Sequence, residues 1–185
     1  VANDASPNFY FRNLGGLKFE DITEKAIEPK AREGWRTGVT MADVNADGHL
    51  DIYVSRAGTS NSHALTANLL YMNNGDGTFT ERANELGVAD TSQSTQAAFF
   101  DADLDGDLDL HVINHPLGRM KGLTNFTART AVEEKRAPTD RFFRNDGGHF
   151  SDATYDAHLE NFDYTLGQSV SVFDEAGSTE IYTAN

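Results

Sequence analysis

The sequence predicts an all-β fold made of repeated four-stranded antiparallel sheets, and two observations carry this prediction. The chain of 185 residues holds 16 Gly and 12 Phe but only 4 Pro and 1 Trp. This composition favours short aromatic-rich strands joined by tight turns over long helices. The chain also repeats itself three times along its length, which is the sequence signature of a repeat architecture.

The first repeated landmark is an apolar strand that ends in a turn of Asn and Gly residues and is followed by a Phe. Its copies are spaced by 60 and then by 72 residues. They lie at 8–13 before Phe19, at 68–73 before Phe79, and at 140–145 before Phe150. The second landmark is an acidic loop followed by a strand-like run. It occurs at 43–51, at 101–109 and, in a degenerate form, at 174–180.

A period near 60 residues with four short strands predicts β-propeller blades, because one such sheet cannot bury both faces without neighbours. We expect the strands of one unit at about 37–42, 50–55, 68–73 and 78–82, with a hairpin turn from Asn73 to Gly77.

The chain is therefore interpreted as a single β-propeller fragment, residues 1–185, of a larger propeller. The repeat units lie at approximately 1–53, 54–111 and 112–182. The ends are expected to be half blades: the outer two strands of one blade at 8–23 and the inner two strands of another at 168–183.

Most of a set of aromatic and apolar residues in these strands are expected to fill the space between blades. They are Phe9, Tyr10, Phe11, Leu70, Tyr71, Phe99, Phe100, Phe142 and Phe143. Trp35, placed by the pattern in a loop before the first strand of the unit, is expected either to pack at a blade edge or to stack on a sugar. The insertion at 115–139 lengthens the third unit and is either a binding loop or a solvated excursion.

Charge and composition exclude several classes of function. The net charge of −14 repels phosphate backbones and anionic lipids, so neither nucleic acid nor a membrane surface is an expected partner. No apolar run reaches the roughly 18 residues of a membrane span, so direct membrane insertion is not expected either. The absence of Cys excludes disulfides, thiolate zinc sites and cysteine nucleophiles. Cations are the expected partners.

The two complete acidic loops predict cation sites. Oxygen-bearing side chains at positions 1, 3, 5 and 9, with Gly at position 6, direct ligands and the carbonyl of position 7 toward one point. The first loop offers the side chains of Asp43, Asn45, Asp47 and Asp51 and the carbonyl of His49. The second offers the side chains of Asp101, Asp103, Asp105 and Asp109 and the carbonyl of Asp107. Calcium accepts 6–8 such oxygens.

These loops are not EF-hands. Position 12, where an EF-hand requires a bidentate Glu, is Val54 in the first loop and Val112 in the second. Both loops also enter β-rich runs instead of helices, so the Asp at position 9 is expected to act as the late ligand within a hairpin. The third loop, 174–180, lacks the alternating acids, so we expect two Ca²⁺ sites.

At these residues the sequence resembles the FG-GAP or VCBS repeats, whose best-known members are the integrin α-subunit propellers. The segments 68–79 and 93–114 most resemble repeats of bacterial secreted proteins related to cartilage acidic protein, which often end in an ASPIC/UnbV domain. The resemblance implies a calcium-braced propeller located outside the cell, on its surface or in the periplasm. It also implies that each ion braces the hairpin between the first two strands of a blade.

No catalytic motif accompanies these loops: the sequence has no Gly-x-Ser-x-Gly elbow, no His-Glu-x-x-His and no phosphate loop, and its histidines are scattered. We therefore expect a non-catalytic recognition or adhesion scaffold for protein or carbohydrate ligands, an expectation that rests mainly on fold analogy. The alternative is part of an extracellular polysaccharide-active enzyme of the lyase or dehydratase type. Expected partners also include further blades of a longer chain or self-association through strand edges.

Overall fold

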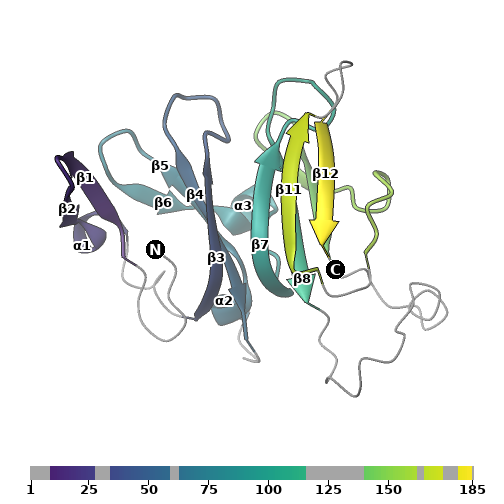
Figure 1. Ribbon diagram of the computed structural model, residues 1–185, viewed down its shortest axis with the longest axis horizontal. Helices are drawn as coiled ribbons and strands as arrows, with labels where there is room; N and C mark the ends of the chain where they lie inside the picture. Colours follow the sequence, from purple (N-terminus) through teal and green to yellow (C-terminus); the bar gives the residue numbers. More distant parts are fainter. Residues whose placement is uncertain are drawn as a thin grey trace.

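The protein is a row of antiparallel sheets that succeed one another along the chain (Figure 1). A computed structural model describes residues 9–27, 34–58, 63–115, 140–161, 165–172 and 179–184. Within these residues the structure is nearly all β, with helices of only four residues each. These are α1 (Thr23–Ala26), α2 (His63–Thr66) and α3 (Ala83–Leu86).

Two complete sheets form the centre of the row, and each is an up-and-down meander of four strands. The first contains β3 (Trp35–Ala42), β4 (Asp51–Ala57), β5 (Leu69–Asn73) and β6 (Phe79–Glu81). The second contains β7 (Gln93–Phe100), β8 (Asp109–His115), β9 (Arg141–Asn145) and β10 (Phe150–Asp152). These are β-propeller blades, as the sequence predicts.

A two-stranded hairpin flanks the complete blades at each end. One end holds β1 (Phe11–Gly15) and β2 (Lys18–Asp21), and the other holds β11 (Gly167–Val172) and β12 (Thr179–Ala184). Within the described residues the sheets do not close into a ring. Each complete blade therefore draws its inner strands from one sequence repeat and its outer strands from the next.

Three apolar clusters fill the spaces between successive sheets. The largest lies between the two complete blades and joins Tyr53 and Leu70 of one to Leu110 and Val112 of the other. A second cluster joins β1–β2 and α1 to the first blade through Ile22. The third joins the second blade to β11–β12 through Ile181. Adjacent residues of a strand thus pack against different neighbouring sheets, because successive side chains of a strand point to opposite faces.

Close approach of the inner strands depends on Gly38 of β3. A Cβ built at Gly38 would lie 2.4 Å from the Thr95 carbonyl oxygen of β7, so no larger residue fits without displacing backbone. In the same region the Thr37 hydroxyl donates a hydrogen bond to the Ser94 carbonyl. Both strands carry a bulge here, between Arg36 and Gly38 and between Ser94 and Gln96.

Two sequence-based placements are wrong. Phe9 and Phe11 do not fill a space between blades but are exposed, because β1–β2 is packed on one face only within the described residues. Trp35 begins strand β3 instead of lying in the preceding loop, and half of its surface is exposed. The hairpin turn at 73–77 is confirmed, with Gly75 and Gly77 at φ of 77° and 89°. Residues 116–139, most of the insertion, lie outside the described residues.

The packing between the complete blades predicts a large and localised sensitivity to cavity formation. Leu110→Ala removes a fully buried side chain from the largest cluster and should destabilise the fold by about 2–5 kcal/mol. The matched control is Leu14→Ala, because Leu14 is exposed and its loss should change stability by less than about 0.5 kcal/mol. Chemical denaturation of the three proteins checks this, and equal losses for both variants would contradict the packing described.

Candidate metal centre

The two complete acidic loops join the inner strands of each blade and emerge at the same edge of the row, at the top of Figure 1. They share one backbone conformation. The residue at position 4 is left-handed in both, with φ of 55° at Ala46 and 62° at Leu104. The Gly at position 6 is left-handed as well, with φ of 87° at Gly48 and 98° at Gly106.

The carboxylate at position 1 holds this conformation by accepting two backbone hydrogen bonds from across the loop. Asp43 accepts from the amides of Asp47 and Gly48 at 3.0 and 2.8 Å. Asp101 accepts from the amides of Asp105 and Gly106 at 3.2 and 3.1 Å. Folding the chain back in this way brings the later side chains of the loop toward its first residue.

The carboxylate at position 9 connects three segments of each blade, and we call this arrangement the aspartate clamp. In the first blade, Asp51 begins β4 and accepts hydrogen bonds from the amides of Val44 in the loop and Asn73 at the end of β5, at 3.0 and 2.8 Å. In the second, Asp109 accepts from the amides of Ala102 and Asn145 at 2.9 and 2.8 Å. Both Asp side chains are buried.

The Asn that ends the third strand completes the clamp from the other side. The Asn73 side-chain amide donates to the Leu50 carbonyl at 3.1 Å, and the Asn145 amide donates to the Leu108 carbonyl at 3.2 Å. Sequence reasoning treats these Asn residues only as turn formers. The signal for their second role is their recurrence six and five residues before a Phe in successive repeats.

Burial sets the electrostatics of the clamp. Burial raises the pKa of Asp51 and Asp109, the two backbone donors oppose this rise, and the other loop carboxylates add to it. Because the pKa of the folded state is raised, the associated stability is present at low pH and is lost as pH rises through the folded pKa. A neighbouring positive charge would offset the cost that burial places on ionising either carboxylate.

The second loop brings three of its carboxylates together. One oxygen each of Asp101, Asp103 and Asp109 lies within 4.8 Å of the others, a spacing suited to a single cation. Asp105 is outside this group, and its Oδ1 accepts the Asp107 amide at 2.9 Å. A carboxylate that accepts one backbone hydrogen bond per oxygen keeps further lone pairs for a metal.

The first loop has the same left-handed backbone positions but replaces one carboxylate with an amide, and among the described residues its Asp43, Asp47 and Asp51 carboxylates do not gather within 4.8 Å as those of the second loop do. The Asn45 side chain donates to Asp47 Oδ2 at 2.9 Å, and this bond, together with that from the His49 amide, lowers the pKa of Asp47. The predicted ligands Asp43, Asn45, Asp47 and Asp51 thus share a loop. The Asn for Asp replacement at position 3 leaves this loop with one negative charge fewer than the second.

The residue at position 7 faces the outer hairpin of its own blade. The Asp107 carboxylate accepts the Gly147 amide of the β9–β10 turn at 2.9 Å, and the His49 ring lies 3.0 Å from a Cβ built at Gly75 of the β5–β6 turn. The sequence expectation used only the carbonyls of His49 and Asp107. Of the degenerate third loop, 174–178 lies outside the described residues, whereas Glu180 is paired with Ser171 in the last hairpin.

The histidines do not gather into a second centre among the described residues. His111 is buried, its Nδ1 lies at hydrogen-bond distance from the Gln168 side chain, and His115 Nε2 contacts the Thr165 carbonyl. Of the described helices, none is long and apolar enough to cross a membrane.

Comparison with known proteins gives one finding. A family model described as an FG-GAP-like repeat matches residues 1–54 and again residues 57–112, which together exceed half of the chain. A search of curated proteins finds no match.

The aspartate clamp predicts a structural role for Asp109 that is separate from any metal. Asp109→Ala removes the acceptor of two backbone amides that are wholly or partly buried, and should destabilise the metal-free protein by on the order of 2 kcal/mol. The control is Asp105→Ala, whose carboxylate is exposed and accepts one exposed amide. Thermal melts in excess chelator compare the two, and equal melting temperatures for both variants would contradict the clamp.

Proposed function

Because the chain belongs to the FG-GAP-like repeat family, we propose that it is a calcium-braced, non-catalytic recognition scaffold that acts outside the cell, on its surface or in the periplasm. The observation that carries the proposal is the group formed by the carboxylates of Asp101, Asp103 and Asp109. The loop that holds them is folded back by hydrogen bonds from two of its own backbone amides to Asp101. The first loop repeats that conformation, which supports two sites of one design.

The donor set favours calcium over other biological cations. All candidate ligands are oxygens, and the side chains at positions 1, 3, 5 and 9 carry a charge of −3 in the first loop and −4 in the second. Calcium accepts 6–8 oxygen ligands in flexible geometry, whereas Mg²⁺ usually keeps several waters, and zinc prefers Cys and His. A divalent cation also offsets the repulsion among carboxylates held within 4.8 Å of one another.

Bound calcium would brace the blade through groups that are already placed. Asp101, Asp103 and Asp109 would supply carboxylate oxygens, joined by the side chain of position 5 and the carbonyl of position 7. Because Asp109 also holds the end of β9, the ion would connect the loop to the outer half of the blade. The ion's part is charge neutralisation and rigidity, with no reaction at the site.

The recognition role rests on the family and on the arrangement of the blades. Rigid sheets that present loops at one edge form a scaffold on which loops bind ligands, here proposed to be a protein or a carbohydrate. FG-GAP repeats are typical of extracellular proteins, and resemblance to repeats of bacterial secreted proteins of the cartilage-acidic-protein type supports the same location. The absence of a catalytic motif from the sequence supports a binding role.

Calcium is expected to stabilise the folded protein through both loops. At a calcium concentration tenfold above the dissociation constant, each site should add about 1.4 kcal/mol. Thermal melts in calcium and in chelator measure this gain. Asp101→Ala should remove the calcium-dependent stabilisation that comes from the second loop and leave that from the first loop unchanged. Melting curves that coincide with and without calcium would contradict the proposal, and the same melts with magnesium test the choice of ion.

The number of sites is a separate prediction. Calorimetric titration should give two calcium ions per chain, because the third loop, 174–180, lacks the alternating acids of the other two. Asp47→Ala and Asp105→Ala should each weaken one site and leave the other unchanged. Three equivalent tight sites would contradict this assignment.

Binding and catalysis are distinguished by glycan-array binding followed by product analysis. The scaffold proposal expects bound ligand to be recovered intact. Calcium-dependent cleavage of a bound polysaccharide would instead establish the alternative, a polysaccharide-active enzyme.

A further inference from the structure

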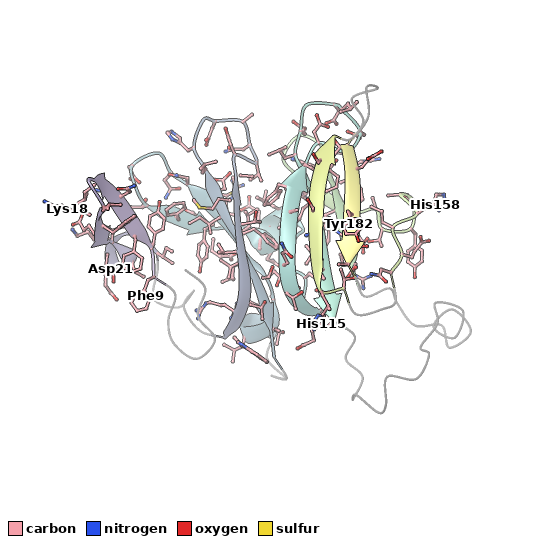
Figure 2. All side chains as sticks on the ribbon, viewed as in Figure 1. Phe9, Lys18, Asp21, His115, His158 and Tyr182 are labelled. Atoms are coloured by element: carbon pink, nitrogen blue, oxygen red, sulfur yellow. The ribbon has the colours of Figure 1, made fainter. Side chains whose placement is uncertain are left out.

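The two acidic loops occupy the same place in successive blades but differ in how their side chains are engaged. Both lie at the edge of the row opposite the labelled His115, the last residue of β8 (Figure 2). Both fold back through the carboxylate at position 1, which accepts the amides of positions 5 and 6. The differences in charge and hydrogen bonding lie at positions 3, 5 and 7.

Position 3 of the second loop is a carboxylate that is already placed beside the others. One oxygen of Asp103 lies within 4.8 Å of one oxygen each of Asp101 and Asp109. Within the described part of the chain, no hydrogen bond engages the Asp103 side chain. These three carboxylates can therefore bind one ion without breaking a hydrogen bond at position 3.

Position 3 of the first loop is an amide that is bonded to position 5. The Nδ2 of Asn45 donates to Asp47 Oδ2 at 2.9 Å, and its Oδ1 accepts the Asp47 amide at 3.3 Å. The other carboxylate oxygen of Asp47 accepts the His49 amide at 2.8 Å. Both oxygens of Asp47 are thus engaged within the loop.

This pairing opposes cation binding at the first loop. An amide NH₂ group is a donor with partial positive charge, and here it faces a carboxylate oxygen that an ion would also bind. The bond lowers the pKa of Asp47, because it stabilises the ionised carboxylate before any ion arrives. Binding through Asp47 Oδ2 has to compete with Asn45, whereas Asp105 Oδ2 accepts no hydrogen bond among the described residues.

Position 7 increases the difference in charge between the loops. Asp107 adds a carboxylate to the second loop, where it accepts the Gly147 amide at 2.9 Å. The first loop has His49 at this position. Over positions 1, 3, 5, 7 and 9, the second loop therefore carries five carboxylates and the first carries three. A divalent cation relieves more repulsion in the second loop.

We propose that the two loops bind calcium in order, the second loop first and the first loop only at a calcium concentration roughly tenfold or more higher, with Asn45 as the residue that sets the difference. This inference rests on the proposed function, in which both loops bind calcium. Ligand charge and site rigidity set the affinity of calcium loops over several powers of ten. The protein then has an intermediate state in which only the second blade is braced, and the first blade is the one that responds to a further rise in calcium.

Each blade carries its own reporter of ion binding. The amide of Asn73 donates to Asp51 and that of Asn145 donates to Asp109, so the nuclear magnetic resonance signal of each amide should shift when the carboxylate at position 9 binds an ion. In a calcium titration of the full 185-residue chain, the Asn145 signal should reach half of its change at a concentration about tenfold or more below that of the Asn73 signal.

Reciprocal variants test the role of position 3, where both side chains are exposed and a change should not prevent folding. Asn45→Asp should lower the midpoint of the Asn73 signal several-fold and leave that of Asn145 unchanged. Asp103→Asn should raise the midpoint of the Asn145 signal and leave that of Asn73 unchanged.

The matched control is Asn74→Asp, which adds the same charge to an exposed turn of the first blade outside the acidic loop. An Asp at this position can still accept from the hydroxyls of Thr78 and Thr80, the present partners of Asn74. Because exposed charges outside the site are screened, the control should move neither midpoint by more than about twofold.

The outcomes separate this inference from the proposed function. A common midpoint for the two signals, a first loop that fills before the second, or an unchanged Asn73 midpoint in Asn45→Asp would overturn the inference and leave calcium binding established. If neither signal moves up to roughly 10 mM calcium, the proposed function fails and this inference fails with it.

Discussion

The buried carboxylate at position 9 of each acidic loop is the interaction on which the rest of a blade depends. Asp51 and Asp109 each accept one hydrogen bond from the loop and one from the end of the third strand. Three segments distant in sequence are thereby fixed around one negative charge. These hydrogen bonds hold the blade together, whereas burial raises the pKa of both groups and so disfavours their ionised form, a cost that a nearby cation would offset.

Because the blade is repeated, the acidic loops and the apolar clusters recur together from one blade to the next. Within the described residues, each apolar cluster joins one sheet to the next, and alternate residues of a strand pack against the sheet before and the sheet after. The acidic loop joins the two inner strands, and the clamp extends its influence to the outer pair. A change at the loop is therefore expected to reach the outer hairpin of the same blade before it reaches the next blade.

Much of this structure could be predicted from the sequence because its signals are local and repeated. The spacing of acids and Gly in 43–51 and 101–109 defines loop conformation, and Asn-Gly turns define hairpins. Which faces are covered by another sheet could not be predicted in the same way. Phe9 and Phe11 have the pattern of buried strand residues, but they are exposed because burial needs a second sheet. The second role of Asn73 and Asn145 depends on side-chain contacts across 23 and 37 residues, which only the recurrence of these Asn residues in successive repeats signals.

Amide hydrogen exchange in excess chelator tests the central claim most directly, namely that the clamps exist before any ion binds. The amides of Asn73 and Asn145 each donate to a clamp carboxylate, so their exchange reports on the clamp itself. We expect both amides to be protected in the metal-free protein, to a degree similar to the central amides of β4 and β8. Exchange of both at the rate of an unstructured peptide, with protection only after calcium is added, would contradict the account.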